Sequence, residues 1–219
     1  MKVVVVAGGQ PDPRDADLLA DADLLIAADA GACWLDELGR TPDVLVGDLD
    51  SIGETLLARL VAAGVEVDHH AAEKDESDAE LALARAVDSG AGEIVILGAL
   101  AGERLDHELA NLLLIADSAW RSSGRDLRIV SGATTVRALH SADRLGLEGK
   151  PGDIVTLLPV GGDAQGVTTD GLAYPLSDEE LRFGRSRGLS NVVQRAGASV
   201  WLTSGTLLVL EIQQQGDDR

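Results

Sequence analysis

Short runs of consecutive apolar residues recur along the first two-thirds of the chain, and polar residues and glycines separate them. Most runs lack the polar alternation of a strand with one face in water. They are typical of strands that are buried on both faces of a parallel sheet. Six strands are therefore predicted, over residues 2–8, 24–29, 43–48, 65–68, 93–99 and 127–130.

Segments with a helical pattern lie between these strands. Four helices are predicted, over residues 30–39, 54–64, 78–90 and 106–120. The last is predicted to be amphipathic, because its apolar residues share one face. They are Leu109, Leu112, Leu113 and Ala116. Strands that alternate with helices predict an α/β layer domain with a parallel sheet.

The pattern changes after about residue 131, where Gly, Pro and Thr become more frequent and helical periodicity disappears. Residues 153–160 are a strand candidate, and residues 198–212 are predicted to form two strands joined as a hairpin at Thr203–Gly205. We therefore predict an α/β domain over residues 1–131 and a smaller all-β domain over residues 132–219.

The net charge of the chain limits the classes of partner that it can bind. There are 37 acidic and 18 basic side chains, a net charge of −19, which argues against nucleic acid or an anionic membrane as the main partner. Five aromatic residues are too few for a surface that stacks bases. Only three lysines are present, so a polyphosphate ligand would need positive charge that metal ions most readily supply.

Other absences limit the chemistry. The single cysteine, Cys33, excludes an internal disulfide and a cysteine-based zinc site, and the histidines show no HExxH spacing. The chain has neither a P-loop motif nor the full GxGxxG fingerprint. The apolar run at residues 2–8 is too short for the core of a signal peptide, and no run reaches membrane-spanning length, so a cytoplasmic location is expected.

Two carboxylates, Asp48 and Asp50, follow the third predicted strand. Ligands of open α/β sheets bind beyond the carboxyl ends of strands, which places these residues and Asp29 on one rim. Paired carboxylates repel each other unless a cation intervenes, and Mg²⁺ prefers carboxylate, water and phosphate oxygens. A helix cap is the alternative, because Ser51 and Glu54 form a capping box. This motif alone leaves both interpretations open.

A second acidic cluster lies in residues 73–84, where Ser77 and Glu80 form another capping box and Asp78 sits beside a helix start. For this segment alone a solvated cap is the simpler interpretation.

In residues 98–113, a third segment, glycines after a strand precede Arg104 and Asp106. That segment has two interpretations. In the first, it wraps a nucleotide, with Arg104 forking onto phosphate oxygens at a helix N-terminus. In the second, Asp106 caps the helix and pairs with Arg104 on the surface.

Taken together, the motifs resemble those of the thiamine pyrophosphokinase family, in the family's order and over essentially the whole chain. They are ADAGACWLDELG, PDVLVGDLDSI, EKDESDAELAL, GERLDHELANL, GLAYPL and FGRSRGLSN. The resemblance implies an N-terminal α/β nucleotide-binding domain and a C-terminal β-sandwich-like domain in a homodimer. It also implies transfer of a diphosphoryl group from Mg²⁺–ATP to the thiamine hydroxyl, giving thiamine diphosphate and AMP.

The resemblance also implies roles for particular residues. The expected ligands of Mg²⁺ and the triphosphate are Asp48, Asp50 and Asp78. The expected nucleotide and phosphate site consists of Asp29, Ser51, Arg104 and Asp106. The thiamine site, where the N-terminal domain of one subunit meets the C-terminal domain of the other, would consist of Tyr174, stacked on thiamine, and Lys74, Ser190 and Asn191. The expected catalytic residues are Asp48, Asp50, Asp78, Arg104 and Asp106, with Asp50 or Asp78 taking the hydroxyl proton.

Three alternatives to this function differ in what they require. A diphosphokinase for another heterocyclic alcohol, such as a hydroxymethylpterin, would keep the acidic cluster and change the pocket around Tyr174. A non-catalytic nucleotide- or thiamine-binding regulator would be favoured by a broken acidic cluster, and here the cluster is intact. A purely structural dimerisation protein leaves the spacing of the carboxylates unexplained.

Overall fold

The computed structural model describes residues 1–122 and 124–214, and the chain divides into two compact units. The first comprises Met1–Leu114 and Trp120–Gly132. The second comprises Ile115–Ala119 and the chain from Ala133 onward. Residues 215–219, which belong to the second predicted domain, lie outside the described residues.

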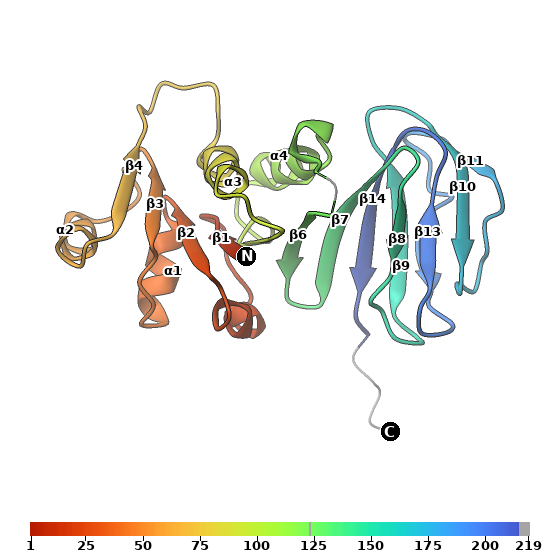
Figure 1. Ribbon diagram of the computed structural model, residues 1–219, viewed down its shortest axis with the longest axis horizontal. Coiled ribbons are helices and arrows are strands. Elements are labelled where there is room, and N and C mark those ends of the chain that lie inside the picture. The colour runs from red at the N-terminus through yellow and green to blue at the C-terminus, as the bar shows by residue number, and fades with distance from the viewer. Residues whose placement is uncertain (123, 215–219) are drawn as a thin grey trace. The chain divides into compact units, whose positions relative to one another are not determined.

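The first unit contains six parallel strands in the order β6-β5-β1-β2-β3-β4; Figure 1 labels all of them except β5. Every predicted strand is present, so the α/β prediction is confirmed. The strands are β1 (Lys2–Val6), β2 (Leu24–Ala28), β3 (Val44–Gly47), β4 (Glu66–His69), β5 (Glu93–Leu97) and β6 (Asp126–Ser131). Four residues of β1, from Val3 to Val6, are fully buried, as expected of a strand covered on both faces.

Four α-helices connect these strands, near the predicted positions. They are α1 (Gly31–Glu37), α2 (Glu54–Ala62), α3 (Asp78–Asp88) and α4 (Leu105–Ile115), and two 3₁₀ helices, η1 (Pro13–Leu19) and η2 (Ser118–Trp120), accompany them. The apolar core of this unit lies between strand and helix side chains such as Val4, Leu35 and Leu45.

One of the two predicted helix caps forms, through the Ser77 half of the predicted capping box. The Glu80 amide donates to Ser77 Oγ at 3.2 Å, so Ser77 caps α3 as predicted. The other prediction is wrong: α2 begins after Gly53 with no side-chain cap, and Ser51 Oγ donates instead to Asp50 Oδ1 at 3.0 Å. Because the helix begins later than the motif suggests, Ser51 is not at its N-cap.

The apolar face predicted for α4 is not buried. Leu109 and Leu113 are 52% and 58% exposed, and Leu105, one turn earlier, is 67% exposed. The helix is held from another side, where Asn111 Nδ2 donates to the Ala99 carbonyl at 2.9 Å and Ile115 is buried. The predicted helix is therefore present, and two of the four residues on its predicted apolar face, Leu109 and Leu113, are exposed.

The strands of the second unit lie in two sheets and pair antiparallel within the unit, in the orders β12-β9-β14-β7 and β11-β10-β13-β8. An apolar core draws on both sheets, including Val155 and Leu157 from one and Val167 and Val200 from the other, which confirms the sandwich-like prediction. The strands are β7 (Thr134–His140), β8 (Arg144–Gly146), β9 (Ile154–Pro159), β10 (Ala164–Asp170), β11 (Glu179–Leu181), β12 (Asn191–Val192), β13 (Ser199–Trp201) and β14 (Thr206–Ile212).

The predicted hairpin between residues 198 and 212 does not form. β13 pairs with β10 and β8, whereas β14 pairs with β7 and β9, so the two strands belong to different sheets. The linking segment is bound to β10, because the amides of Thr203 and Ser204 donate to the Gln165 carbonyl at 2.9 and 3.3 Å. Among the described residues, no helix is long and apolar enough to cross a membrane.

Asp15, in η1, is a buried carboxylate that the sequence did not single out. It is 2% exposed, and the Gly132 amide donates to both its oxygens at 3.1 Å. Burial raises the pKa of Asp15 above its ordinary value of 3.8, and the carboxylate of Asp12 adds to the shift. The nearby Arg14 opposes it.

The raised pKa of Asp15 predicts a pH dependence of stability. The folded state binds this proton more tightly than the unfolded chain, so the contribution of Asp15 to the free energy of unfolding falls as pH rises from 3.8 through the folded pKa. The non-titrating variant Asp15→Asn should therefore gain melting temperature relative to the wild type as pH rises from about 3.5 to about 7. A difference that shrinks over this range would contradict the assignment.

Candidate functional site

A pocket of about 640 Å³ opens in the first unit, where the chain leaves the carboxyl ends of β1, β2, β3 and β5. This is the position at which open α/β sheets bind ligands. The segment before α3 and the start of α4 complete its wall. The lining includes Gly8, Gly9, Asp29, Asp48, Ser51, Lys74, Ser77, Asp78, Gly98, Arg104, His107 and Asn111.

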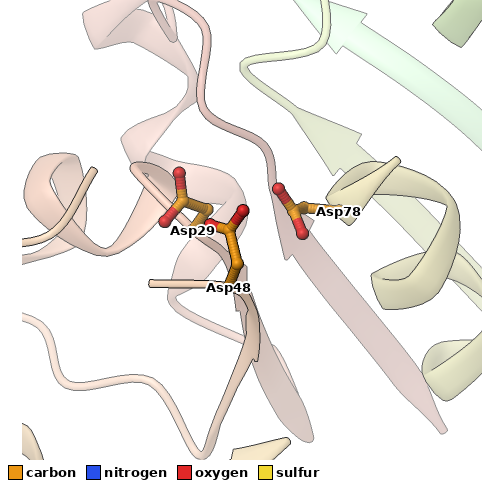
Figure 2. A group of neighbouring side chains, drawn as sticks. All are labelled: Asp29, Asp48 and Asp78. Atoms are coloured by element: carbon orange, nitrogen blue, oxygen red, sulfur yellow. The ribbon is translucent and has the colours of Figure 1, made fainter. Parts of the chain in front are cut away.

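Three half-buried carboxylates meet in this pocket, as Figure 2 shows. Asp29 follows β2, Asp48 follows β3 and Asp78 begins α3. One oxygen of each lies within 4.8 Å of the other two. A hard divalent cation such as Mg²⁺ takes oxygen ligands of this kind.

Asp50, which the sequence pairs with Asp48, is not part of this group. It lies exposed in the turn after β3, accepts the Ser51 hydroxyl, and is absent from the pocket lining. The sequence therefore identified Asp48 and Asp78 as expected metal ligands, and it placed Asp29 on the same rim as Asp48 but in the expected nucleotide and phosphate site. The signal for Asp29 was its position at the end of a buried strand. Metal binding by Asp50 stays a prediction.

The backbone around the carboxylates is strained in a way that makes room for them. Asp29 and Leu49 have φ values of +42° and +67°, which residues other than glycine seldom adopt. A Cβ on Gly47 would lie 2.9 Å from Asp78 Oδ1, so a glycine is needed at this strand end. The strain is concentrated at the ends of β2 and β3, as is common at functional sites.

Lys74 places a positive charge among the carboxylates. Its Nζ is 2.9 Å from Asp78 Oδ1 and 4.0 Å from Asp48 Oδ2, and its side chain is only 13% exposed. The close contact with Asp78 raises the pKa of Lys74, and the charges of Asp48 and Asp29 add to the effect. The lysine therefore stays protonated.

Two carboxylate oxygens in the cluster fit a metal ligand set. Asp29 Oδ1 is buried and has no hydrogen-bond partner among the described residues, and Asp78 Oδ1 is buried with the Lys74 ammonium 2.9 Å away. Burial, reinforced by the charges of Asp78 and Asp48, raises the pKa of Asp29. A bound cation would satisfy these oxygens and favour the charged form of Asp29.

Arg104 and Asp106 form the surface pair of the second interpretation of their segment, but Asp106 is not the predicted helix cap, because α4 begins one residue earlier, at Leu105. Arg104 Nε and Nη2 donate to the two Asp106 oxygens at 2.9 and 2.6 Å. These bonds lower the pKa of Asp106 to about 2. Arg104 lines the pocket and Asp106 does not, so phosphate binding remains a prediction for both.

Two glycines of the pocket allow its loops to approach each other closely, a role that the sequence did not reveal. A Cβ on Gly9 would lie 2.3 Å from the Gly98 carbonyl oxygen, and the Gly9 amide donates to that oxygen at 2.9 Å. The loops after β1 and β5 can approach this closely only because both positions are glycine. "VVVVAGG" fails the dinucleotide fingerprint but still indicates close backbone approach.

A smaller pocket of about 130 Å³ lies in the second unit and contains three of the predicted thiamine residues, Tyr174, Ser190 and Asn191. Asn191 is 7% exposed; its Oδ1 accepts the Tyr174 amide at 2.9 Å and its Nδ2 donates to the Tyr174 carbonyl at 2.7 Å. It therefore holds the backbone of Tyr174, whose side chain is exposed. The fourth predicted residue, Lys74, lies in the carboxylate pocket of the first unit.

Two family models match the chain. Residues 16–127 match "Thiamin pyrophosphokinase, catalytic domain" and residues 144–207 match "Thiamin pyrophosphokinase, vitamin B1 binding domain". Thiamine pyrophosphokinase of Bacillus subtilis (strain 168) is 25% identical over 213 residues, which cover 96% of this chain and 98% of that protein. Thiamine pyrophosphokinase 2 of Arabidopsis thaliana is 28% identical over 240 residues, covering 98% of this chain and 88% of the relative.

A solved structure shares the fold. The crystal structure of thiamine pyrophosphokinase from Bacillus subtilis matches with a TM-score of 0.86 at 24% identity, covering 98% of this chain and all of that one. The likeness therefore extends over both units.

Proposed function

The chain belongs to the thiamin pyrophosphokinase family, and from this premise we infer that it transfers a diphosphoryl group from ATP to the hydroxyl of thiamine. The products are thiamine diphosphate and AMP. One observation carries the assignment of the site: three carboxylates from separate elements converge within 4.8 Å in the strand-end pocket. An intact acidic cluster is not expected of a non-catalytic regulator. The match to the vitamin B1 binding model favours thiamine over a pterin alcohol.

Mg²⁺ would be held by Asp29, Asp48 and Asp78, because their oxygens are close and partly without other partners. When bound, it would neutralise charge on the phosphate oxygens of ATP. Asp50 is retained as a further predicted ligand from the turn after β3.

The protein's own residues then orient the reaction. The thiamine oxygen attacks the β-phosphorus, the bond from that phosphorus to the α–β bridging oxygen breaks, and AMP leaves. Arg104, on the pocket wall, is placed to donate to phosphate oxygens. The hydroxyl proton passes to a carboxylate, for which Asp78 and Asp50 are the proposed acceptors.

Thiamine would be bound by the second unit, with Tyr174 stacked on it, Ser190 supplying a hydroxyl and Asn191 fixing the Tyr174 backbone. We assign residues 1–131 to the catalytic domain and residues 132–219 to thiamine binding and dimerisation. A homodimer would bring the catalytic domain of one subunit to the thiamine domain of the other. Its cytoplasmic location also stays a prediction.

Replacing Tyr174 by alanine tests the thiamine pocket. The loss of the stacking ring should raise the KM for thiamine about tenfold. The KM for ATP should change little, because Tyr174 does not line the carboxylate pocket. Steady-state assays with each substrate varied give both constants. Tyr174→Phe, which keeps the ring, should restore thiamine affinity, and an unchanged thiamine KM in Tyr174→Ala would place thiamine elsewhere.

A further inference from the structure

We propose that Lys74 is the protein's own counter-cation for Asp48 and Asp78, and that it competes with the divalent cation for them. Metal binding would then depend on the nucleotide, which offers the displaced ammonium a new partner. The inference rests on the proposed function, in which these carboxylates hold the metal.

The first observation is that the Lys74 ammonium contacts two carboxylates of the cluster. Its Nζ lies 2.9 Å from Asp78 and 4.0 Å from Asp48, and the side chains of both aspartates are largely buried, at 27% and 18% exposure. Oxygens of Asp48 and Asp78 lie within 4.8 Å of each other, and like charges repel strongly at that distance when water is partly excluded. The ammonium therefore relieves the repulsion that a divalent cation would otherwise relieve.

The position of the carboxylates places the two cations in competition. The oxygens of Asp29, Asp48 and Asp78 that could ligate one ion lie within 4.8 Å of one another, and Lys74 contacts two of these three residues. An ion bound to both Asp48 and Asp78 would sit beside the ammonium. Repulsion between the two cations would therefore favour movement of Lys74, which its flexible four-carbon stem permits.

The phosphates of a bound nucleotide would give the displaced Lys74 ammonium a new partner. Lys74 lines the same pocket as Arg104 and the glycine loops, where the phosphates of ATP are proposed to bind. An ammonium binds phosphate as a point charge and needs no fixed geometry. Because such coupling is reciprocal, the nucleotide should raise the affinity for metal, and metal the affinity for nucleotide, by way of the same side chain.

The first test measures Mn²⁺ binding without nucleotide, from the electron paramagnetic resonance signal of the free ion. Lys74→Met should bind Mn²⁺ about tenfold more tightly than the wild type. Arg85→Met is the matched control, because it also removes a cation that is ion-paired with a carboxylate: Arg85, on α3, pairs with Glu66, on β4, at 2.9 Å and lies outside the pocket. It should bind Mn²⁺ as the wild type does.

Repeating the titration with α,β-methylene-ATP tests the coupling. The nucleotide should increase Mn²⁺ affinity more in the wild type than in Lys74→Met, because only the wild type has an ammonium to relocate. Equal or weaker Mn²⁺ binding by Lys74→Met in the absence of nucleotide would overturn this inference but not the proposed function. An absence of Mn²⁺ binding in both proteins would overturn the metal assignment of the proposed function, and this inference with it.

A second test needs no variant. The chain has three lysines, so acetylation of each can be followed in the wild type by peptide mass spectrometry. Mg²⁺ alone, at high concentration, should free the Lys74 amine from its carboxylates and raise its acetylation rate. Lys2 and Lys150 serve as internal references, and a Lys74 rate that Mg²⁺ alone leaves unchanged or lowers would contradict displacement.

Discussion

Replacing Asp48 by asparagine is expected to lower thiamine-dependent AMP formation by about a hundredfold to a thousandfold. Asp48 ends β3 inside the pocket and belongs to the carboxylate group that would hold the metal. The substitution keeps the shape of the side chain and removes its charge, so the fold should persist while the phosphate charge loses its counter-ion. A coupled assay of AMP release and a Mg²⁺ titration measure the loss in kcat and in metal dependence.

Asp75→Asn is the matched control for this prediction. Asp75 lies in the same acidic segment as Lys74 and Asp78, but it is exposed and outside the pocket lining. It should retain most of the activity. If Asp48→Asn keeps activity within a few-fold of the wild type, or if both variants lose it equally, the carboxylate group is not the centre of the reaction.

Asp48→Asn, combined with Tyr174→Ala, also tests the shared site proposed for the homodimer. Asp48→Asn damages the first unit and Tyr174→Ala damages the second. If each site takes one unit from each subunit, mixing the two variants should form dimers that carry one intact site. Activity at low thiamine should then exceed that of either variant alone. No gain after subunit exchange would contradict a site that is built across subunits.

Replacing Glu211 by alanine is expected to destabilise the second unit by about 3–5 kcal/mol. Glu211 on β14 is 6% exposed; it accepts Arg137 Nη1 at 3.1 Å and the amides of Glu148 and Gly149 at 2.7 and 2.9 Å. Truncation leaves those amides without this acceptor and removes the buried partner of Arg137, whose side chain is 5% exposed. Chemical denaturation followed by tryptophan fluorescence measures the loss.

The same arginine provides the control. Arg137 also pairs with Glu148, whose side chain is 73% exposed. An exposed partner contributes about 0–1 kcal/mol, so Glu148→Ala should change stability little. Similar losses for the two variants would show that burial does not determine the strength of these pairs.

The strands and helices of the first unit were predictable because their signals are local. β1, β2, β3 and β5 are continuous apolar runs, and such runs become the buried strands of a parallel sheet. The Ser77–Glu80 cap was likewise readable within four residues. The hairpin between β13 and β14 failed because pairing partners are chosen across the whole unit, and a Thr-Ser-Gly segment serves equally well to pass between two sheets.

Individual residues of the candidate site could be predicted from the sequence, but the place where they meet could not. Asp48 and Asp78 stood out in acidic motifs, and Asp29 stood out as a strand end. Their meeting point depends on strand order, because β2 and β3 are neighbours and α3 lies against them. No pattern in one sequence fixes that order. Lys74 is the clearest example: the resemblance placed it in the thiamine site, and its position among the carboxylates became visible only in the fold.

The most direct measurement identifies the products that the wild-type protein forms from Mg²⁺–ATP with and without thiamine, by phosphorus NMR and mass spectrometry. Diphosphoryl transfer predicts AMP and thiamine diphosphate in equal amounts, with no AMP when thiamine is omitted. A hydroxymethylpterin in place of thiamine should give none. Production of ADP and thiamine monophosphate, or AMP only with the pterin, would contradict the account.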